Sequence, residues 1–186
     1  MPEELVPHWG NYKKLLSFQK AECIYDLTYY FCRNFLRKND RTVDQMIQAA
    51  RSGKQNIVEG SAAASTSREM EIKLLNVAKA SLHELLADYE DFLRSRSHRQ
   101  WEENSVELLK MRELGRARND SAFFMRLAST RPPETIANMA IVLIKQADYL
   151  LFRQIQRASA EFLKHGGMRE RMTRLRLQAR SRQSRP

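Results

Sequence analysis

Apolar residues recur along most of this chain at intervals of three and four residues, the spacing that aligns side chains on one face of an α-helix. The cleanest amphipathic stretch carries one apolar face, formed by Leu74, Ala78, Leu82, Leu85, Tyr89 and Leu93. Strand-like alternation and internal repeats are absent from the sequence. The pattern therefore predicts an all-helical protein with four long helices, over about residues 14–38, 42–59, 66–94 and 134–164.

Residues that favour helix ends lie where the apolar periodicity starts and stops. Thr42-x-x-Gln45 and Thr66-x-x-Glu69 have the form of a capping box, which satisfies free backbone N–H groups at a helix start. Gly60 lies where a glycine commonly follows a helix C-terminus. Pro132-Pro133 precedes the fourth long helix, and Gly166-Gly167 follows it.

The predicted helices divide the chain into a tail, a bundle and an extension. We expect residues 1–13 to form an N-terminal tail, 14–164 to form the bundle and 165–186 to form an Arg-rich C-terminal suffix. Residues 95–133 are polar and irregular, and they form an insertion with short helices near 105–118 and 123–127. The fold class predicted is an all-α, antiparallel up-down four-helix bundle with an insertion between helices 3 and 4 and a basic C-terminal extension.

The first and the fourth of the predicted long helices each carry a second apolar face. A solitary four-helix bundle needs one buried stripe per helix, so each second face needs an additional cover. The insertion is one candidate, since Trp101, Leu108 and Phe123 could fold back over the bundle. Another copy of the protein is the alternative, and the insertion and a second copy could each cover part of these faces. We expect a homo-oligomer interface formed by Phe18, Tyr25, Tyr29, Ile141, Val142, Tyr149 and Phe152.

Positive charge is strong and unevenly distributed. The formal net charge is +10, of which residues 165–186 hold +6, from seven arginines and the single acid Glu170. Arginine suits bidentate phosphate contact, so the chemistry fits nucleic-acid backbone binding without base readout. The alternative is a solvated basic tail, or one packed on acidic helix faces of a neighbour. The candidate nucleic-acid-binding residues are Arg169, Arg171, Arg174, Arg176, Arg180 and Arg182.

Lys54 is a further candidate for anion contact, because it lies inside the apolar stripe of the second predicted helix. A lysine in such a stripe can also extend its aliphatic stem along apolar surface while its ammonium stays in water. The sequence leaves both readings open.

Patterns typical of catalysis or metal binding are missing from the sequence. It contains no phosphate-binding loop, no G-x-S-x-G motif, no Cys-x-x-Cys motif and no Glu-x-x-His pair. His98/Glu102 and Glu161/His165 are isolated pairs at a spacing of four residues, whereas a metal site needs three or four convergent ligands. We therefore expect a non-enzymatic protein without a cofactor or a metal site.

Localisation follows from cysteine usage and hydropathy. Cys23 and Cys32 are too far apart along one predicted helix to form a disulfide, which indicates reduced packing residues in a cytoplasmic protein. The N-terminus lacks the features of a signal peptide. The most apolar stretch, 136–144, is too short to span a bilayer, so no membrane partner is expected.

The order of several short motifs resembles the bacterial four helix bundle protein family. The motifs are Tyr12-Lys13-Lys14-Leu15-Leu16 with Gln19-Lys20-Ala21, Asp44-Gln45-Met46 with Ala49-Ala50-Arg51-Ser52, and Asn56-Ile57-Val58-Glu59-Gly60. In the last motif Val58 replaces the usual alanine. The runs 144–151 and 166–171 are similar to a longer subgroup with a C-terminal suffix domain.

The resemblance implies an assembly and a role. Relatives include proteins encoded in intervening sequences of large-subunit ribosomal RNA genes and the accessory variability determinant of retroelements. They form pentameric barrels with a basic surface, and the retroelement member is similar to a nucleic-acid-binding adaptor for a reverse transcriptase. The resemblance therefore implies a homo-pentamer, with a nucleic acid and a reverse transcriptase as its partners.

The combined expectation is a non-enzymatic, homo-oligomeric helical scaffold that binds RNA or DNA backbone through a basic surface. The alternative is a protein–protein adaptor or structural assembly protein with no nucleic-acid role. Steep salt dependence of binding would separate the two, because backbone binding releases counterions.

Overall fold

The computed structural model describes residues 11–37 and 39–183, and its described part is an all-α helical bundle without β-strands. A short 3-10 helix, η1 (Tyr12–Lys14), precedes the first α-helix. The α-helices are α1 (Leu16–Phe35), α2 (Arg41–Ala63), α3 (Arg68–Ser95), α4 (Val106–Ala117), α5 (Ser121–Ala128), α6 (Pro133–His165) and α7 (Met168–Gln183). The prediction of an all-helical protein is confirmed, and a helix lies near each predicted range, although several helix ends differ.

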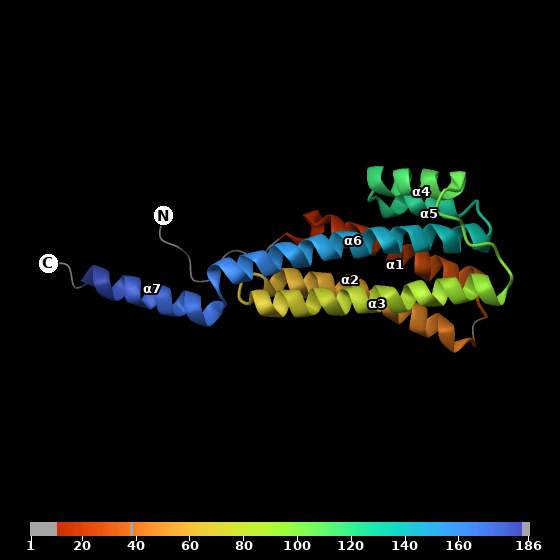
Figure 1. Cartoon of the computed structure of the whole chain (residues 1–186). Coiled ribbons are helices and arrows are strands. Elements are labelled where there is room, and N and C mark those ends of the chain that lie inside the picture. The colour runs from red at the N-terminus through yellow and green to blue at the C-terminus, as the bar shows by residue number, and fades with distance from the viewer. Residues whose placement is uncertain (1–10, 38, 184–186) are drawn as a thin grey trace.

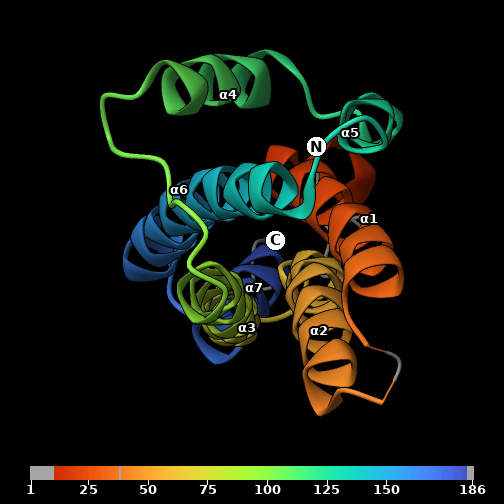
Figure 2. The same cartoon turned by 90° about the vertical axis from the view of Figure 1, so that its right-hand side faces the viewer.

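The four longest helices of the bundle surround a common hydrophobic core. Helices α1, α2, α3 and α6 each pack against two of the others, in the order α1–α2–α3–α6 and back to α1 (Figures 1 and 2). Aromatic rings fill one part of this core: Phe31 of α1 lies 5.1 Å from Tyr89 and 4.8 Å from Phe92 of α3, measured between ring centroids. The apolar periodicity of the sequence thus supplies one shared core.

Polar side chains cap the starts of four helices. Asp40, Ser67, Ser105 and Asp120 each accept a hydrogen bond from a backbone N–H in the first turn that follows. Such a side chain satisfies one of the N–H groups that have no partner within the helix. The two short helices of the insertion therefore begin at positions that their own sequence determines.

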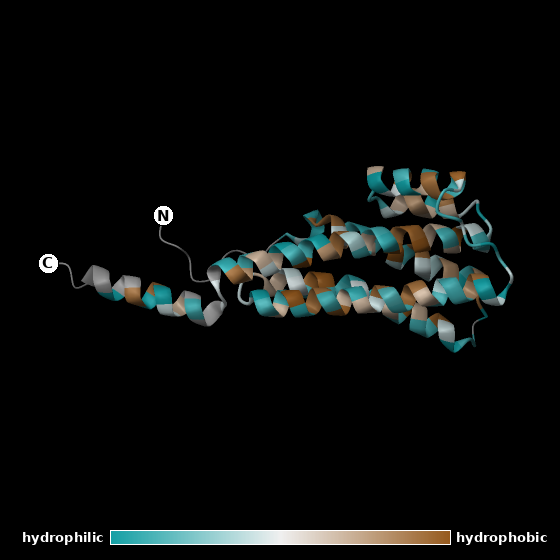
Figure 3. Cartoon of the chain, in the orientation of Figure 1, coloured by the Kyte–Doolittle hydropathy of each residue, from teal (hydrophilic) through white to brown (hydrophobic). Residues whose placement is uncertain are grey.

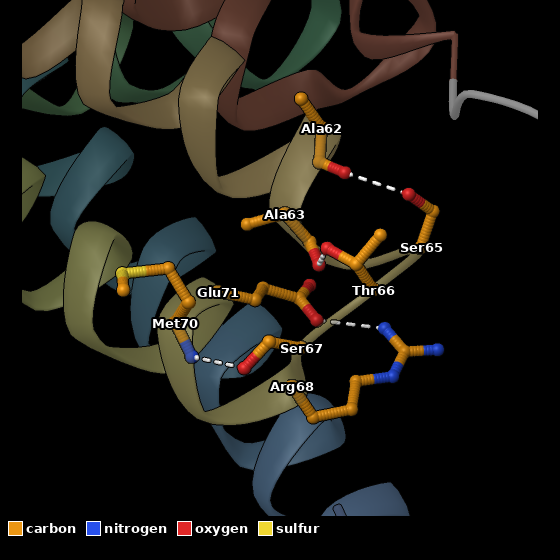
Figure 4. Close-up of polar contacts among 8 residues, drawn as sticks. All are labelled: Ala62, Ala63, Ser65, Thr66, Ser67, Arg68, Met70 and Glu71. Atoms are coloured by element: carbon orange, nitrogen blue, oxygen red, sulfur yellow. Dashed lines mark hydrogen bonds and ion pairs between the residues drawn. The ribbon is translucent and has the colours of Figure 1, made fainter. Parts of the chain in front are cut away.

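The predicted capping boxes at Thr42 and Thr66 are wrong by one or two positions. Helix α3 is capped by Ser67, whose Oγ accepts from the N–H of Met70 at 3.2 Å (Figure 4). Thr66 instead donates back to the carbonyl of Ala63, at the end of α2. Arg68 and Glu71 form an ion pair at 2.7 Å within the first turn of α3. Thr66 and Ser67 are both residue types that can cap a helix start, and the path of the backbone determines that Ser67 caps α3.

The prediction that Gly60 ends the second helix is also wrong, because α2 continues to Ala63 and Gly60 is buried inside it. Gly60 and Gly53 face α3 across the closest part of the α2–α3 contact. A β-carbon at Gly53 would lie 2.8 Å from Cδ2 of Leu82, and one at Gly60 would lie 3.5 Å from Cδ2 of Leu75. The two glycines allow close helix approach rather than chain reversal.

The insertion lies on the outside of the bundle and covers α1 and α6. Helix α5 packs against α1 and α4 packs against α6, as the end-on view in Figure 2 shows. Phe124 of α5 and Leu108 of α4 are buried beneath it. The second apolar faces of the two long helices are therefore covered in part by the same chain.

Helix α6 is the central apolar helix of the fold (Figure 3). Its length and composition alone would allow it to cross a membrane, although the run that the sequence pattern marked is shorter. In the structure 61% of its apolar window is buried against other helices, as is also seen in core helices of water-soluble proteins. Its hydrophobicity thus has a packing explanation, because α1, α3 and α4 all contact it.

Candidate functional site

Buried polar side chains hold the insertion against the bundle. Asn138, which interrupts the apolar run of α6, accepts a hydrogen bond from the N–H of Trp101 at 2.8 Å. Its Nδ2 donates to the carbonyls of Arg99 and of Glu134, both at 2.9 Å. A buried amide is costly unless it is hydrogen-bonded, and this one is bonded in both directions. Asn138 therefore fixes the chain where it enters the insertion.

Lys20 of α1 makes the matching contact at the other end of α4. Its side chain is 1% exposed, and its Nζ donates to the carbonyl of Gly115 and, at 2.9 Å, to the carbonyl of Arg118. A cation is stabilised there by the negative end of the α4 helix dipole and by carbonyls that lack helical partners. Burial lowers the pKa of Lys20 to about 8. Lys20 was not predicted as a site residue from the sequence, although a lysine inside an apolar helix face was the available signal.

Gln146 of α6 completes the set of contacts to α4. Its Nε2 donates to the carbonyl of Arg112 at 2.9 Å, which fixes the orientation of the amide. Its Oε1 is buried without a hydrogen-bond partner and lies against Gly115, in the space that a β-carbon would take. An unpaired buried acceptor is uncommon in folded proteins and calls for a structural reason.

A cavity of about 620 Å³ lies between α4 and α6, in the region that these contacts enclose. Its apolar walls include Trp101, Leu108, Ile141 and Val142. Its polar lining includes four cations and one acid: Lys20, Arg112, Arg116, Lys145 and Glu103. Within the described residues none of the four cations takes part in an ion pair.

The predicted self-association residues separate into two groups. Phe18, Ile141 and Val142 are 7%, 4% and 4% exposed within the single chain, so they cannot form a contact surface for another copy without rearrangement. The insertion accounts for Ile141 and Val142, which line the α4–α6 cavity. For these three residues the expectation of an exposed interface is corrected. The remaining four, Tyr25, Tyr29, Tyr149 and Phe152, lie at the surface in part or in full.

Tyr25 and Tyr29 form an aromatic surface on the α1–α2 side, with their ring centroids 6.4 Å apart. Lys54 of α2 places its Nζ 4.2 Å from the centroid of Tyr25, and Arg33 lies 5.2 Å from that of Tyr29. A cation over an aromatic ring is attracted by the electron-rich face of the ring. Lys54 thus contacts a predicted interface residue, and we name this set of four residues the α1–α2 patch.

Tyr149 and Phe152 form a second aromatic surface on the α3–α6 side, and they are 58% and 46% exposed. Lys79 of α3 lies 5.7 Å from the Phe152 ring centroid, and Arg153 donates to the Tyr149 hydroxyl at 3.1 Å. We name these four residues the α3–α6 patch. Because α1–α2 and α3–α6 are opposite pairs in the bundle, the two patches lie on opposite sides (Figure 2).

Helix α7 carries most of the predicted phosphate-binding arginines. It extends beyond the end of the bundle, away from α4 and α5 (Figure 1). Arg174, Arg176 and Arg180 are exposed on it. The side chains of Arg169, Arg171 and Arg182 lie outside the described part of the structure, and their role in phosphate binding stays a prediction.

The two cysteines are buried packing residues, and two histidines form pairs with acidic side chains. Burial raises the pKa of the Cys23 and Cys32 thiols to about 12, which suppresses the reactive thiolate form. Within the described residues no group of three histidine, cysteine or acidic side chains is placed to hold a metal ion. His98 pairs with Glu134 at 3.1 Å, and His83 pairs with Asp148 at 2.7 Å.

No protein-family model matches this chain, and no curated protein or solved structure is significantly similar to it. The resemblance carried by the short motifs therefore stays a prediction.

Proposed function

We propose that this protein is a non-enzymatic helical scaffold that associates with copies of itself and binds the phosphate backbone of RNA or DNA through α7. The observation that carries the proposal is the placement of an arginine-rich helix outside the bundle. There Arg174 and Arg176 are exposed, and Glu170 is the one acidic residue in the sequence of α7. Clustered arginines on an exposed helix give sequence-independent attraction to phosphates.

The composition of α7 supports contact with a polyanion rather than with the bundle core. Its arginines are distributed around the helix, and it shows no apolar stripe of the kind that docks a helix onto a core (Figure 3). Leu177 is 60% exposed and Met172 is 39% exposed, so these two apolar side chains of α7 are not covered by the bundle.

The two aromatic patches support self-association. They lie on opposite sides of the bundle, so the α1–α2 patch of one copy can meet the α3–α6 patch of the next. A head-to-tail contact of this kind closes into a ring when the rotation between copies allows it. Exposed tyrosine and phenylalanine flanked by cations are typical of protein interfaces. We further propose that the long helices form an up-down four-helix bundle, with 95–133 as its insertion and α7 as an appended suffix.

Salt-dependent binding to unrelated duplex RNA and DNA tests the phosphate-binding role. The variant Arg174→Gln/Arg176→Gln/Arg180→Gln should bind more weakly, and its slope of log affinity against log salt should fall by roughly 2–3. The matched control Lys110→Gln/Arg126→Gln/Arg131→Gln removes the same charge from exposed positions on the insertion. An equal loss in both variants, or no salt dependence in the parent protein, would reject α7 as the binding element.

A protein–protein adaptor without a nucleic-acid role is the second candidate, and the aromatic patches favour it. It predicts that the α7 variant assembles and binds its protein partner normally while the parent protein shows no affinity for either nucleic acid. The same titration therefore separates the two functions.

A further inference from the structure

We propose that the cavity between α4 and α6 is a binding site for a small amphipathic organic anion, with an apolar body and one carboxylate or phosphate group. The inference does not rest on the proposed function, because neither α7 nor either aromatic patch provides its walls, apart from Tyr149 at one edge. Four observations support it, namely the size of the cavity, the hydrogen bonds that frame it, its charge and its apolar walls.

The cavity has the size of a ligand site. Its volume of about 620 Å³ lies within the range of roughly 300–1,000 Å³ in which small-molecule sites are found. Its walls come from four separate segments of the chain, α1, the 100–103 segment, α4 and α6. Glu103, Arg116 and Lys145 of the lining are exposed, so the cavity is open to solvent and a free ligand can enter it.

Hydrogen bonds before and within α4 hold this helix beside the cavity. Asn138 holds the backbone at Trp101, in the segment before α4. Gln146 and Lys20 bind carbonyls in the middle of α4 and near its C-terminal end. Helix α4 therefore cannot move toward α6 to fill the space without breaking buried hydrogen bonds, each worth about 1 kcal/mol. The site is pre-formed, which reduces the conformational cost of binding.

The charge of the lining selects the sign of the ligand. Lys20, Arg112, Arg116 and Lys145 contribute to the lining, with Glu103 as its one acidic residue, so the lining residues carry a formal excess of three positive charges. Lys20 is buried and is held by backbone carbonyls rather than by a carboxylate. A buried charge is normally paired, and an anion in the cavity would supply the missing counter-charge.

The apolar walls require that the rest of the ligand be hydrophobic. Trp101, Leu108, Ile141 and Val142 offer a surface for an alkyl or aromatic body. The Lys20 ammonium lies at the Gly115 end of the cavity lining, against the carbonyl of Gly115. The polar end of the cavity is thus at Gly115 and the apolar end is at Trp101.

Trp101 provides the readout, because the chain has two tryptophans and Trp9→Phe leaves Trp101 as the sole emitter. Decanoate, decyl phosphate, decan-1-ol and decylamine are titrated into this protein below their micelle concentrations. We expect saturable changes in emission with decanoate or decyl phosphate, at affinities at least about tenfold above those of decanol and decylamine. Comparison of the first two probes identifies which anionic group is preferred. Equal affinity for decanoate and decanol, or tighter binding of decylamine, would overturn the proposal.

Two variants locate the charge that selects the anion. Lys145→Gln/Arg116→Gln removes exposed cations from the cavity lining, and we expect decanoate affinity to fall about tenfold while decanol affinity stays constant. Lys110→Gln/Arg126→Gln removes two exposed cations outside the lining and is the matched control. An equal effect of the two variants would assign the binding to overall charge and would reject the site.

Val142→Phe fills the cavity and should abolish binding of both decanoate and decanol, with helix content checked by circular dichroism.

Deletion of residues 1–10, which include Glu3, Glu4 and Trp9, tests the alternative that the N-terminal segment of this chain occupies the cavity. Decanoate binding that appears only after the deletion would show that the occupant is this segment and not a free anion. Binding that depends on protein concentration would assign the cavity to a second copy.

Discussion

The ammonium of Lys20 on α1 donates a buried hydrogen bond to the carbonyl of Gly115, the third-last residue of α4. Ninety-five positions separate the two residues in the sequence. Their contact joins the first helix of the bundle to the insertion and satisfies a carbonyl that has no partner within its own helix. Because this ammonium is buried, we expect the stability of the protein to depend on pH.

We expect the stability difference between the parent protein and Lys20→Met to depend on pH. The folded-state pKa of Lys20, about 8, lies below the ordinary lysine value of 10.5, so the unfolded chain binds more protons between these two values. The parent protein should therefore gain roughly 1–2 kcal/mol relative to Lys20→Met between pH 7 and pH 9.5. Urea unfolding at both pH values measures this difference.

Lys73→Met is the control for that measurement, because Lys73 is exposed on α3. Its stability difference from the parent protein should be constant over the same pH range. A difference for Lys20→Met that is also constant would show that the Lys20 ammonium is not destabilised by burial.

Two buried glycines of α2 should respond to alanine in opposite directions. At Gly53 a β-carbon would lie 2.8 Å from Cδ2 of the fully buried Leu82, so Gly53→Ala should lower the free energy of unfolding by about 1–3 kcal/mol. At Gly60 the nearest atom is 3.5 Å away, an ordinary contact, and Gly60→Ala should raise stability by roughly 0.5–1 kcal/mol through helix propensity. Thermal and urea unfolding of both variants check the pair, and the same sign in both would contradict this account of the α2–α3 contact.

The hydroxyl of Tyr89 should contribute to stability through Thr28. Its Oη donates to Thr28 Oγ1 at 3.0 Å, with both side chains fully buried between α3 and α1. Tyr89→Phe should cost about 1 kcal/mol, the usual net worth of such a bond. In the background of Thr28→Val the same change should cost clearly less, and a double-mutant cycle measures the coupling. Additive effects would show that the bond contributes no net stability.

Self-association should depend on the exposed aromatic residues and not on the buried members of the predicted set. Tyr29→Asp or Tyr149→Asp should reduce the particle mass measured by light scattering while leaving helix content unchanged, because both side chains are exposed. Leu163→Asp is the control, since Leu163 is 84% exposed on α6 outside both patches. A monomeric parent protein, or dissociation by Leu163→Asp alone, would contradict the assignment of the patches. Val142→Asp is unsuitable for this test, because it would place a charge in the chain's own interior.

The four long helices of the bundle could be predicted from the sequence because their apolar residues repeat with the period of the helix itself, and local hydrogen bonds to Ser and Asp set several helix starts. Helix ends were less certain because neighbouring residues have similar local preferences, as Thr66 and Ser67 show. Gly60 was misassigned because its role depends on Leu75, a residue of another helix.

The sequence by itself determined that this protein is helical, which faces of the long helices are apolar, and that its C-terminal extension is rich in arginine. Only the tertiary structure decided which apolar residues are covered, because burial depends on where the insertion folds. Phe18, Ile141 and Val142 are buried while Tyr149 and Phe152 remain at the surface, although all of them share the same kind of pattern. The placement of Lys20, Asn138 and Gln146 around the insertion was likewise beyond the sequence, since each binds backbone atoms far away along the chain.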